Sequence, residues 1–143
     1  MTDWLSYFDR LAKEVAKQRP DPDTKVGALL ISRENHAIIG TAFNGLPSGT
    51  RHEARRLMRP TKYDYMCHAE MNLIAFAARN AVSTENRMLY CTHKPCLICT
   101  RLIIQAGISA VYFGDGVHSD ESEFHKCEQL FSEAKVVVVG DST

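Results

Sequence analysis

The chain has 143 residues, and its 17 Lys and Arg balance 17 Asp and Glu, so its formal net charge is zero. Apolar residues make up 45% of the sequence and charged residues 24%, which is close to globular averages and excludes a disordered tail, a coiled coil and a collagen-like repeat. The length favours one domain over residues 1–143, and zero net charge argues against a protein that coats polymeric nucleic acid through a basic face.

Two features concern membranes and secretion. The longest uncharged apolar run, near residues 136–139, is far shorter than the ~20 residues that a membrane helix needs. Residues 1–4 lack a basic start followed by an apolar core, so we expect no secretory signal. We therefore expect a cytoplasmic protein without a membrane partner, in the host-cell cytoplasm if the source is viral.

The first 43 residues are expected to form a helix and a β-hairpin. Apolar residues spaced three and four apart predict an amphipathic helix over residues 3–18, and two prolines within residues 19–23 end it. The apolar stripe consists of Leu5, Phe8, Ala12 and Val15. Two runs rich in β-forming residues, 26–31 and 37–43, are joined by turn-like residues, which predicts a hairpin.

Turn formers dominate residues 44–65, a segment whose length is typical of functional loops and leaves room for a short helix through residues 53–58. Beyond it, strands alternate with helices. The expected elements are helix 68–80, strand 88–92, helix 95–107, strand 110–113, a helix that begins with a capping box of Asp120 and Glu123, and a buried strand 136–139. This order predicts an α/β domain with a single mixed five-stranded sheet and helices on both faces.

Five cysteines stand at positions 67, 91, 96, 99 and 127. An odd number without a signal peptide is poor support for a disulfide framework and favours metal binding or catalysis. Cys91 lies in a strand-like run and Cys127 on a helical apolar stripe, so we expect both to be buried thiols.

The strongest chemical signal is a pair of clusters, His-Ala-Glu at 68–70 and Pro-Cys-Leu-Ile-Cys at 95–99. Cys96 and Cys99 are three residues apart, so both sulfurs can point the same way from the first turn of a helix. Helix N-termini favour thiolates, and two such termini can converge on one point. A zinc ion held by His68, Cys96 and Cys99 would keep its fourth tetrahedral position for water, as in catalytic sites.

Glu70 stands two residues from His68 and can lie beside the coordinated water without binding the metal. A carboxylate there can take a proton from the water and deliver it to a substrate. The pattern H-x-E…P-C-x-x-C is the signature of zinc deaminases. The competing interpretation is a structural zinc knuckle, which would want a fourth protein ligand; Cys67 and His93 are the nearby candidates.

Four segments carry a more specific resemblance. They read Asp-Pro-Asp-Thr-Lys-Val-Gly-Ala at 21–28, Phe-Asn-Gly-Leu-Pro at 43–47, His-Ala-Glu-Met-Asn at 68–72 and Pro-Cys-Leu-Ile-Cys at 95–99. In these segments the chain resembles the cytidine deaminase-like superfamily and, within it, the deoxycytidylate (dCMP) deaminases. The resemblance spans about residues 25–120. It implies the three-layer α/β/α fold of that superfamily and zinc-dependent hydrolysis of dCMP to dUMP and ammonia, which supplies dUMP for thymidylate synthesis.

The resemblance also implies roles for individual residues. His68, Cys96 and Cys99 would bind one catalytic zinc per chain, and Glu70 would be the proton shuttle. Asn44 would hydrogen-bond the nucleotide, and the Ala69 backbone N–H would contact the pyrimidine. The remaining candidate substrate-binding residues are Thr24, Lys25, Asn72 and Tyr112. The candidates to meet the 5′-phosphate are Thr24, Lys25 and Asn72, together with arginines of the long loop such as Arg51. Many members form hexamers that dCTP activates and dTTP inhibits, with Mg²⁺ on the triphosphate, so the resemblance implies a homo-oligomer and these effectors.

Residues 51–62 carry five cationic side chains against one acid, Glu53, a local excess of 5 − 1 = +4. The cationic residues are Arg51, Arg55, Arg56, Arg59 and Lys62. The segment is either an anion-binding rim for a nucleotide or a solvated face or subunit contact. Three alternatives to a dCMP deaminase also stay open: a nucleoside cytidine deaminase, a tRNA adenosine deaminase, which zero net charge disfavours, and a non-catalytic zinc-binding module.

Overall fold

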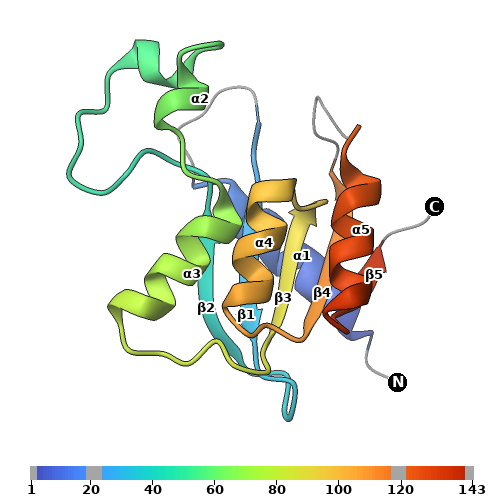
Figure 1. The fold of residues 1–143 in the computed structure, drawn as a ribbon. Helices are drawn as coiled ribbons and strands as arrows, with labels where there is room; N and C mark the ends of the chain where they lie inside the picture. Colours follow the sequence, from blue (N-terminus) through green and yellow to red (C-terminus); the bar gives the residue numbers. More distant parts are fainter. Residues whose placement is uncertain (1–2, 19–23, 117–121, 141–143) are drawn as a thin grey trace.

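The computed structural model describes residues 3–18, 24–116 and 122–140, which form one mixed five-stranded sheet with helices on both faces (Figure 1). The strand order is β2-β1-β3-β4-β5. In chain order the elements are α1 (Trp4–Ala16), β1 (Gly27–Ile31), β2 (Ile38–Phe43), the 3-10 helix η1 (Ala54–Leu57), α2 (Lys62–Tyr65), α3 (Ala69–Arg79), β3 (Met88–His93), α4 (Leu97–Gln105), β4 (Ala110–Gly116), α5 (Phe124–Glu133) and β5 (Val137–Gly140). The predicted fold class is confirmed. None of the described helices is both long and apolar enough to cross a bilayer.

The strand directions bring three chain segments to one end of the sheet. β1 is antiparallel to β2 and β3, whereas β3, β4 and β5 are parallel. Gly27, the first residue of β1, lies opposite Phe43, the last residue of β2. The Gly27 N–H also donates to Thr92 Oγ1, near the end of β3, at 3.2 Å. We call this end, where β1 begins and β2 and β3 stop, the site end of the sheet.

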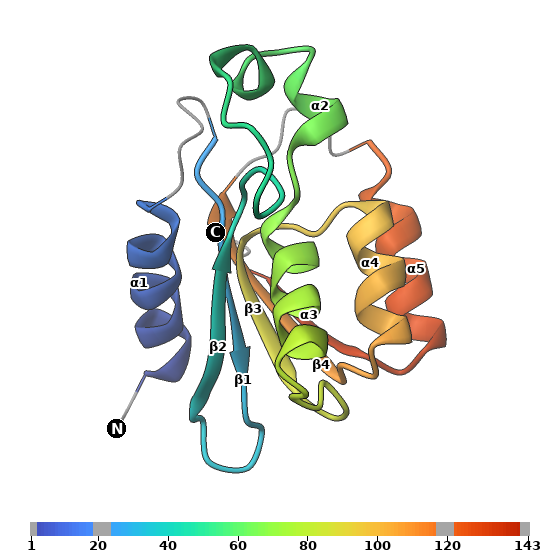
Figure 2. The ribbon, with the colours of Figure 1, turned by 90° about the vertical axis from the view of Figure 1, so that its left-hand side faces the viewer.

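The two faces of the sheet carry separate cores. α1 covers one face, and α3, α4 and α5 cover the other (Figure 2). On β1, Ala28 and Leu30 pack on the side of α3 and α4, whereas Leu29 and Ile31 pack beneath α1, and all four are fully buried. Because successive side chains of a strand alternate between faces, a strand covered on both faces has the continuous apolar sequence seen here.

Two expectations about the C-terminal part are wrong. β5 is not a buried strand, because Val137 is 46% and Val139 37% exposed. It is an edge strand, and only the face that carries Val138 packs against the main core. The last helix does not begin with a capping box that contains Glu123: it begins at Phe124, and the Glu123 carboxylate pairs with Lys126 at 3.1 Å instead. The residues expected to complete the box and to end the first helix, Asp120 and 19–23, lie outside the described residues.

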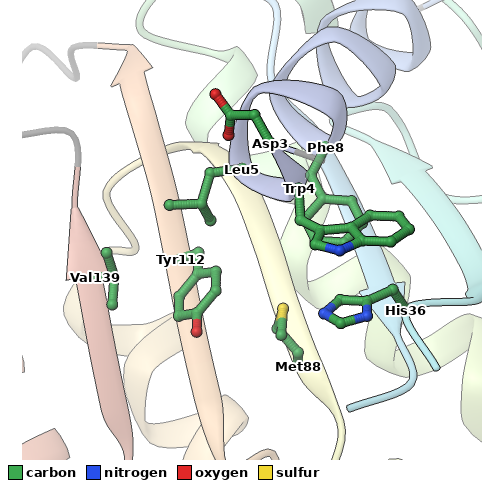
Figure 3. A pocket seen from close by; sticks show the side chains of 8 residues that line it. All are labelled: Asp3, Trp4, Leu5, Phe8, His36, Met88, Tyr112 and Val139. Carbon is green, nitrogen blue, oxygen red and sulfur yellow. The ribbon is translucent and has the colours of Figure 1, made fainter. Parts of the chain in front are cut away.

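A hollow of about 520 Å³ lies on the face covered by α1 (Figure 3). Its walls are the start of α1 and side chains from β3, β4 and β5, together with His36 from the hairpin turn. Trp4 stacks on the His36 ring with their centroids 4.4 Å apart. The hollow is therefore an aromatic and aliphatic surface, on the other face of the sheet from α3 and α4.

Replacing Gly27 with alanine tests how closely α1 packs on β1. A Cβ at Gly27 would overlap the backbone carbonyl of Ala12, which cannot rotate away as a side chain does. We expect Gly27→Ala to lower the free energy of unfolding by about 2 kcal/mol, measured by denaturant titration. Gly45→Ala is the control, because a Cβ there meets only the Phe43 ring, at 3.9 Å. Equal stability of the two variants would contradict this packing.

Candidate metal centre

The N-termini of α3 and α4 meet at the site end of the sheet. His68 is the N-cap of α3 and Cys96 is the N-cap of α4, both with extended backbone. Cys96 Sγ accepts the Cys99 backbone N–H at 3.5 Å, as an N-cap side chain does. The two helices lie side by side on one face (Figures 1 and 2), so their first turns converge.

His68, Cys96 and Cys99 form a compact cluster of donor atoms. His68 Nδ1 lies 3.4 Å from the Sγ of each cysteine, and the three donor atoms lie within 4.8 Å of one another. In a tetrahedral site with Zn–N near 2.1 Å and Zn–S near 2.3 Å, the N···S edge is about 3.6 Å. The donor set and its spacing therefore fit zinc.

The cluster has three protein ligands rather than four. Cys67 and His93, the candidates for the fourth ligand of a structural knuckle, do not belong to this cluster of described residues. The His93 ring contacts Thr92 Oγ1 at 2.8 Å instead. Three protein ligands are typical of catalytic zinc sites, which keep one position for water or substrate.

The electrostatics of the cluster favour a thiolate. The Cys99 thiol and then the His68 imidazole pair with Cys96 Sγ and hold the pKa of Cys96 well below its usual value. The same pairing with Cys96, followed by burial, raises the pKa of Cys99, and the contact with Cys96 raises the pKa of His68. Partial positive charge at the N-terminus of α4 acts in the same direction on Cys96.

Glu70 lies beside the cluster without belonging to it. It stands in the first turn of α3 and is 2% exposed. Burial and then the Glu70 carboxylate raise the pKa of the Cys91 thiol on β3, and the same carboxylate adds to the raised pKa of Cys99. Cys91 and Cys127 are buried, as expected from the sequence.

Asn44 fastens the segment that precedes β1. Its Oδ1 accepts the Val26 N–H at 3.0 Å, and its Nδ2 donates to the Thr24 carbonyl, also at 3.0 Å. The next residue, Gly45, exchanges two backbone hydrogen bonds with Cys67, of 3.0 and 2.8 Å. The loop that carries Asn44 is thereby tied to the residue before His68. Sequence reasoning missed this tie, since no periodicity marks an isolated bridge.

The other candidate substrate-binding residues, Tyr112 excepted, lie at the same end of the sheet. Asn72 Nδ2 donates to the Phe43 carbonyl at 2.9 Å and so joins α3 to the end of β2. Ala69 is buried in the first turn of α3, where a backbone N–H has no acceptor within the helix. Thr24 is half-buried and Lys25 is exposed, directly before β1.

Tyr112 lies elsewhere. It pairs with Tyr90 in the middle of the sheet, and its side chain packs with the core beneath α1 and lines the hollow of Figure 3. Its neighbour Val111 packs into the opposite core. The structure therefore does not bring Tyr112 together with the cluster, and it stays a sequence-based expectation.

Residues 44–66 form a lobe that rises above the site end (Figures 1 and 2). Within this lobe, Glu53 pairs with Arg55 at 2.8 Å, and the Arg56 guanidinium lies 4.5 Å from the centroid of the Tyr65 ring. Arg51 is 85% exposed, with Glu53 at 3.9 Å, whereas Lys62 is buried. Most of the local positive charge is thus engaged inside the lobe or solvated.

Comparison with known proteins agrees with this site. The family model described as the cytidine and deoxycytidylate deaminase zinc-binding region matches residues 2–115. The chain is 35% identical to the deoxycytidylate deaminase of Homo sapiens over 140 residues, which cover 94% of this chain and 77% of the human protein.

Solved structures show the same fold. The dCMP deaminase of the cyanophage S-TIM5 in its apo form matches with a TM-score of 0.75 and 26% identity, over 99% of this chain and 100% of the phage chain. The structure of the phage protein in complex with dCMP and dUMP gives a TM-score of 0.77 at 24% identity, over 99% of each chain.

The fold and the three-donor cluster define a zinc-binding protein of the deaminase class. The chain belongs to the cytidine and deoxycytidylate deaminase family. Its cofactor is zinc, as the sequence predicted.

Metal analysis of cysteine variants tests the cluster. We expect about one zinc per purified chain and loss of most of it in Cys96→Ser and in Cys99→Ser, because each variant lacks one of three protein ligands. Cys67→Ser is the control. Cys67 is next to His68 in the chain but does not belong to the cluster, so this variant should keep the metal. Full zinc in both ligand variants, or loss only in Cys67→Ser, would contradict the assignment.

Proposed function

We propose that the protein is a single-domain, cytoplasmic dCMP deaminase, which hydrolyses dCMP to dUMP and ammonia and supplies dUMP for thymidylate synthesis. The observation that carries this proposal is the buried Glu70 carboxylate beside a three-donor zinc cluster, in a chain that belongs to the deaminase family. The deoxycytidylate deaminases among its relatives support dCMP as the substrate.

The chain's own residues divide the work. His68, Cys96 and Cys99 would hold the zinc, which when bound would lower the pKa of a water into the neutral range. Glu70 takes a proton from the attacking water and delivers it to the ring nitrogen beside the amine-bearing carbon. Glu70 then transfers the second proton of the water to the departing amine. The oxygen of the water becomes the carbonyl oxygen of dUMP, and ammonia leaves.

Polar groups at the site end orient the nucleotide. The Ala69 backbone N–H contacts the pyrimidine. The Asn44 amide has a second N–H besides the one bound to the Thr24 carbonyl, and it donates to the nucleotide. Thr24, Lys25 and Asn72 lie near the 5′-phosphate, which explains a preference for a nucleotide over a nucleoside.

Assembly and regulation follow from the family resemblance. We infer a homo-oligomer, with a hexamer favoured, that dCTP activates and dTTP inhibits, with Mg²⁺ on the triphosphate. Substrate saturation curves with and without each triphosphate test the regulation; superimposable curves would remove it. The mass in solution tests the assembly.

Glu70→Gln separates proton transfer from metal binding. The amide keeps the size of the side chain but cannot carry a proton, so we expect deamination to fall by about 10²- to 10⁴-fold. Zinc content and melting temperature should stay near those of the parent protein. Activity of Glu70→Gln within a few-fold of the parent protein would show that another group moves the proton. If the parent protein binds zinc but deaminates no nucleotide, the result would favour a non-catalytic zinc-binding module.

The ratio of kcat/KM for dCMP and deoxycytidine tests the substrate. Two charge-assisted contacts to phosphate would separate dCMP from deoxycytidine by about 10²- to 10⁴-fold in kcat/KM. We expect Lys25→Ala to narrow this gap mainly by lowering kcat/KM for dCMP. Equal values in the parent protein would move it to the nucleoside deaminases. The remaining alternative, a tRNA adenosine deaminase, is tested by assaying the formation of inosine in a tRNA anticodon stem-loop.

A further inference from the structure

One arginine of the 44–66 lobe differs from the others in what it contacts. Glu53 pairs with Arg51, Arg55 and Arg56 but not with Arg59. Arg59 instead reaches out of the lobe, and its Nη2 donates to Thr24 Oγ1 at 3.4 Å. Arg59 thus links the lobe to Thr24, in the segment before β1.

This contact lies at the rim of the site end. Thr24 is held there because its carbonyl accepts from Asn44 Nδ2 at 3.0 Å. Gly45, next to Asn44, is bridged to Cys67, which precedes the metal ligand His68. Arg59 is therefore connected to the metal cluster through Thr24, Asn44 and the Gly45–Cys67 bridge, on the side where the lobe overhangs the site end (Figures 1 and 2).

The contact itself is weak enough to be replaced. At 3.4 Å, a hydrogen bond to a neutral hydroxyl is at the long limit of such bonds. A guanidinium has five N–H donors in a planar fork, which matches the oxygens of a phosphate and binds them more strongly than a hydroxyl. An anion that enters beside Thr24 would meet Arg59 directly.

We propose that Arg59 is a specificity-determining residue that binds the 5′-phosphate of the nucleotide, an inference that rests on the proposed function. With the pyrimidine at the metal cluster, the phosphate end of the substrate extends to the rim formed by Thr24 and the lobe. Arg59 reaches that rim from the lobe, where its Nη2 meets Thr24 Oγ1. The lobe thereby closes over the charged end of the substrate and leaves the reacting ring to the residues of α3 and α4.

The test compares kcat/KM for dCMP and for deoxycytidine in Arg59→Ala, with Arg55→Ala as the matched control. Arg55→Ala removes the same charge from the same lobe, but its guanidinium is bound to Glu53. We expect Arg59→Ala to lower kcat/KM for dCMP by about 10- to 100-fold and to leave deoxycytidine unchanged. Arg59→Lys should restore part of the loss, because it keeps the charge without the fork. Arg55→Ala should change both substrates by less than about twofold.

Binding of the product gives a readout that does not depend on turnover. Calorimetric titration with dUMP and with deoxyuridine should show weaker binding of dUMP alone in Arg59→Ala. Unchanged zinc content and melting temperature in Arg59→Ala would exclude a folding effect. If the variant has less zinc, a lower melting temperature and less activity on both substrates, Arg59 has a structural role and the proposal is overturned.

The remaining outcomes distinguish a failure of the Arg59 proposal from a failure of the proposed function. A parent protein that prefers dCMP, with the same preference in Arg59→Ala, would overturn the inference and leave the proposed function intact. Equal falls in Arg59→Ala and Arg55→Ala would assign recognition to the general charge of the lobe and also overturn it. A parent protein without preference for dCMP would instead overturn the mononucleotide assignment itself.

Discussion

Three side chains from two helices must share one ion, and this requirement dictates where the rest of the site can lie. His68 closes the start of α3, and Cys96 and Cys99 occupy the first turn of α4, so neither helix can shift along its axis without opening the cluster. The parallel pair β3 and β4 and the packing of both helices on one face fix their relative position. A buried carboxylate can then stand next to the ion without being consumed as a ligand.

Side-chain amides provide the second level of order. Asn44 and Asn72 each bind a backbone carbonyl from another part of the chain, the first on the segment before β1 and the second at the end of β2. These hydrogen bonds stabilise the fold, because a buried carbonyl without a donor would lower the free energy of unfolding. These amides tie the segment before β1 to the start of the 44–66 lobe, and the end of β2 to α3.

The parts of the structure that depend on local spacing could be predicted from sequence. The ligand set follows from three residues near two helix starts, and the fold class from alternating strands and helices. Tyr112 was expected near the substrate but faces α1, because a strand fixes only the alternation of its side chains and not which helix covers which face. The burial of β5 was overestimated for a similar reason, since an apolar run does not reveal that its strand is at an edge.

The two backbone bonds between Gly45 and Cys67 close the lobe at its base, a few residues from the metal. A loop closed in this way can lengthen, shorten or exchange its sequence at a cost that grows only slowly with length. Residues 46–66 can therefore change in length and sequence while the metal ligands at the starts of α3 and α4 keep their positions.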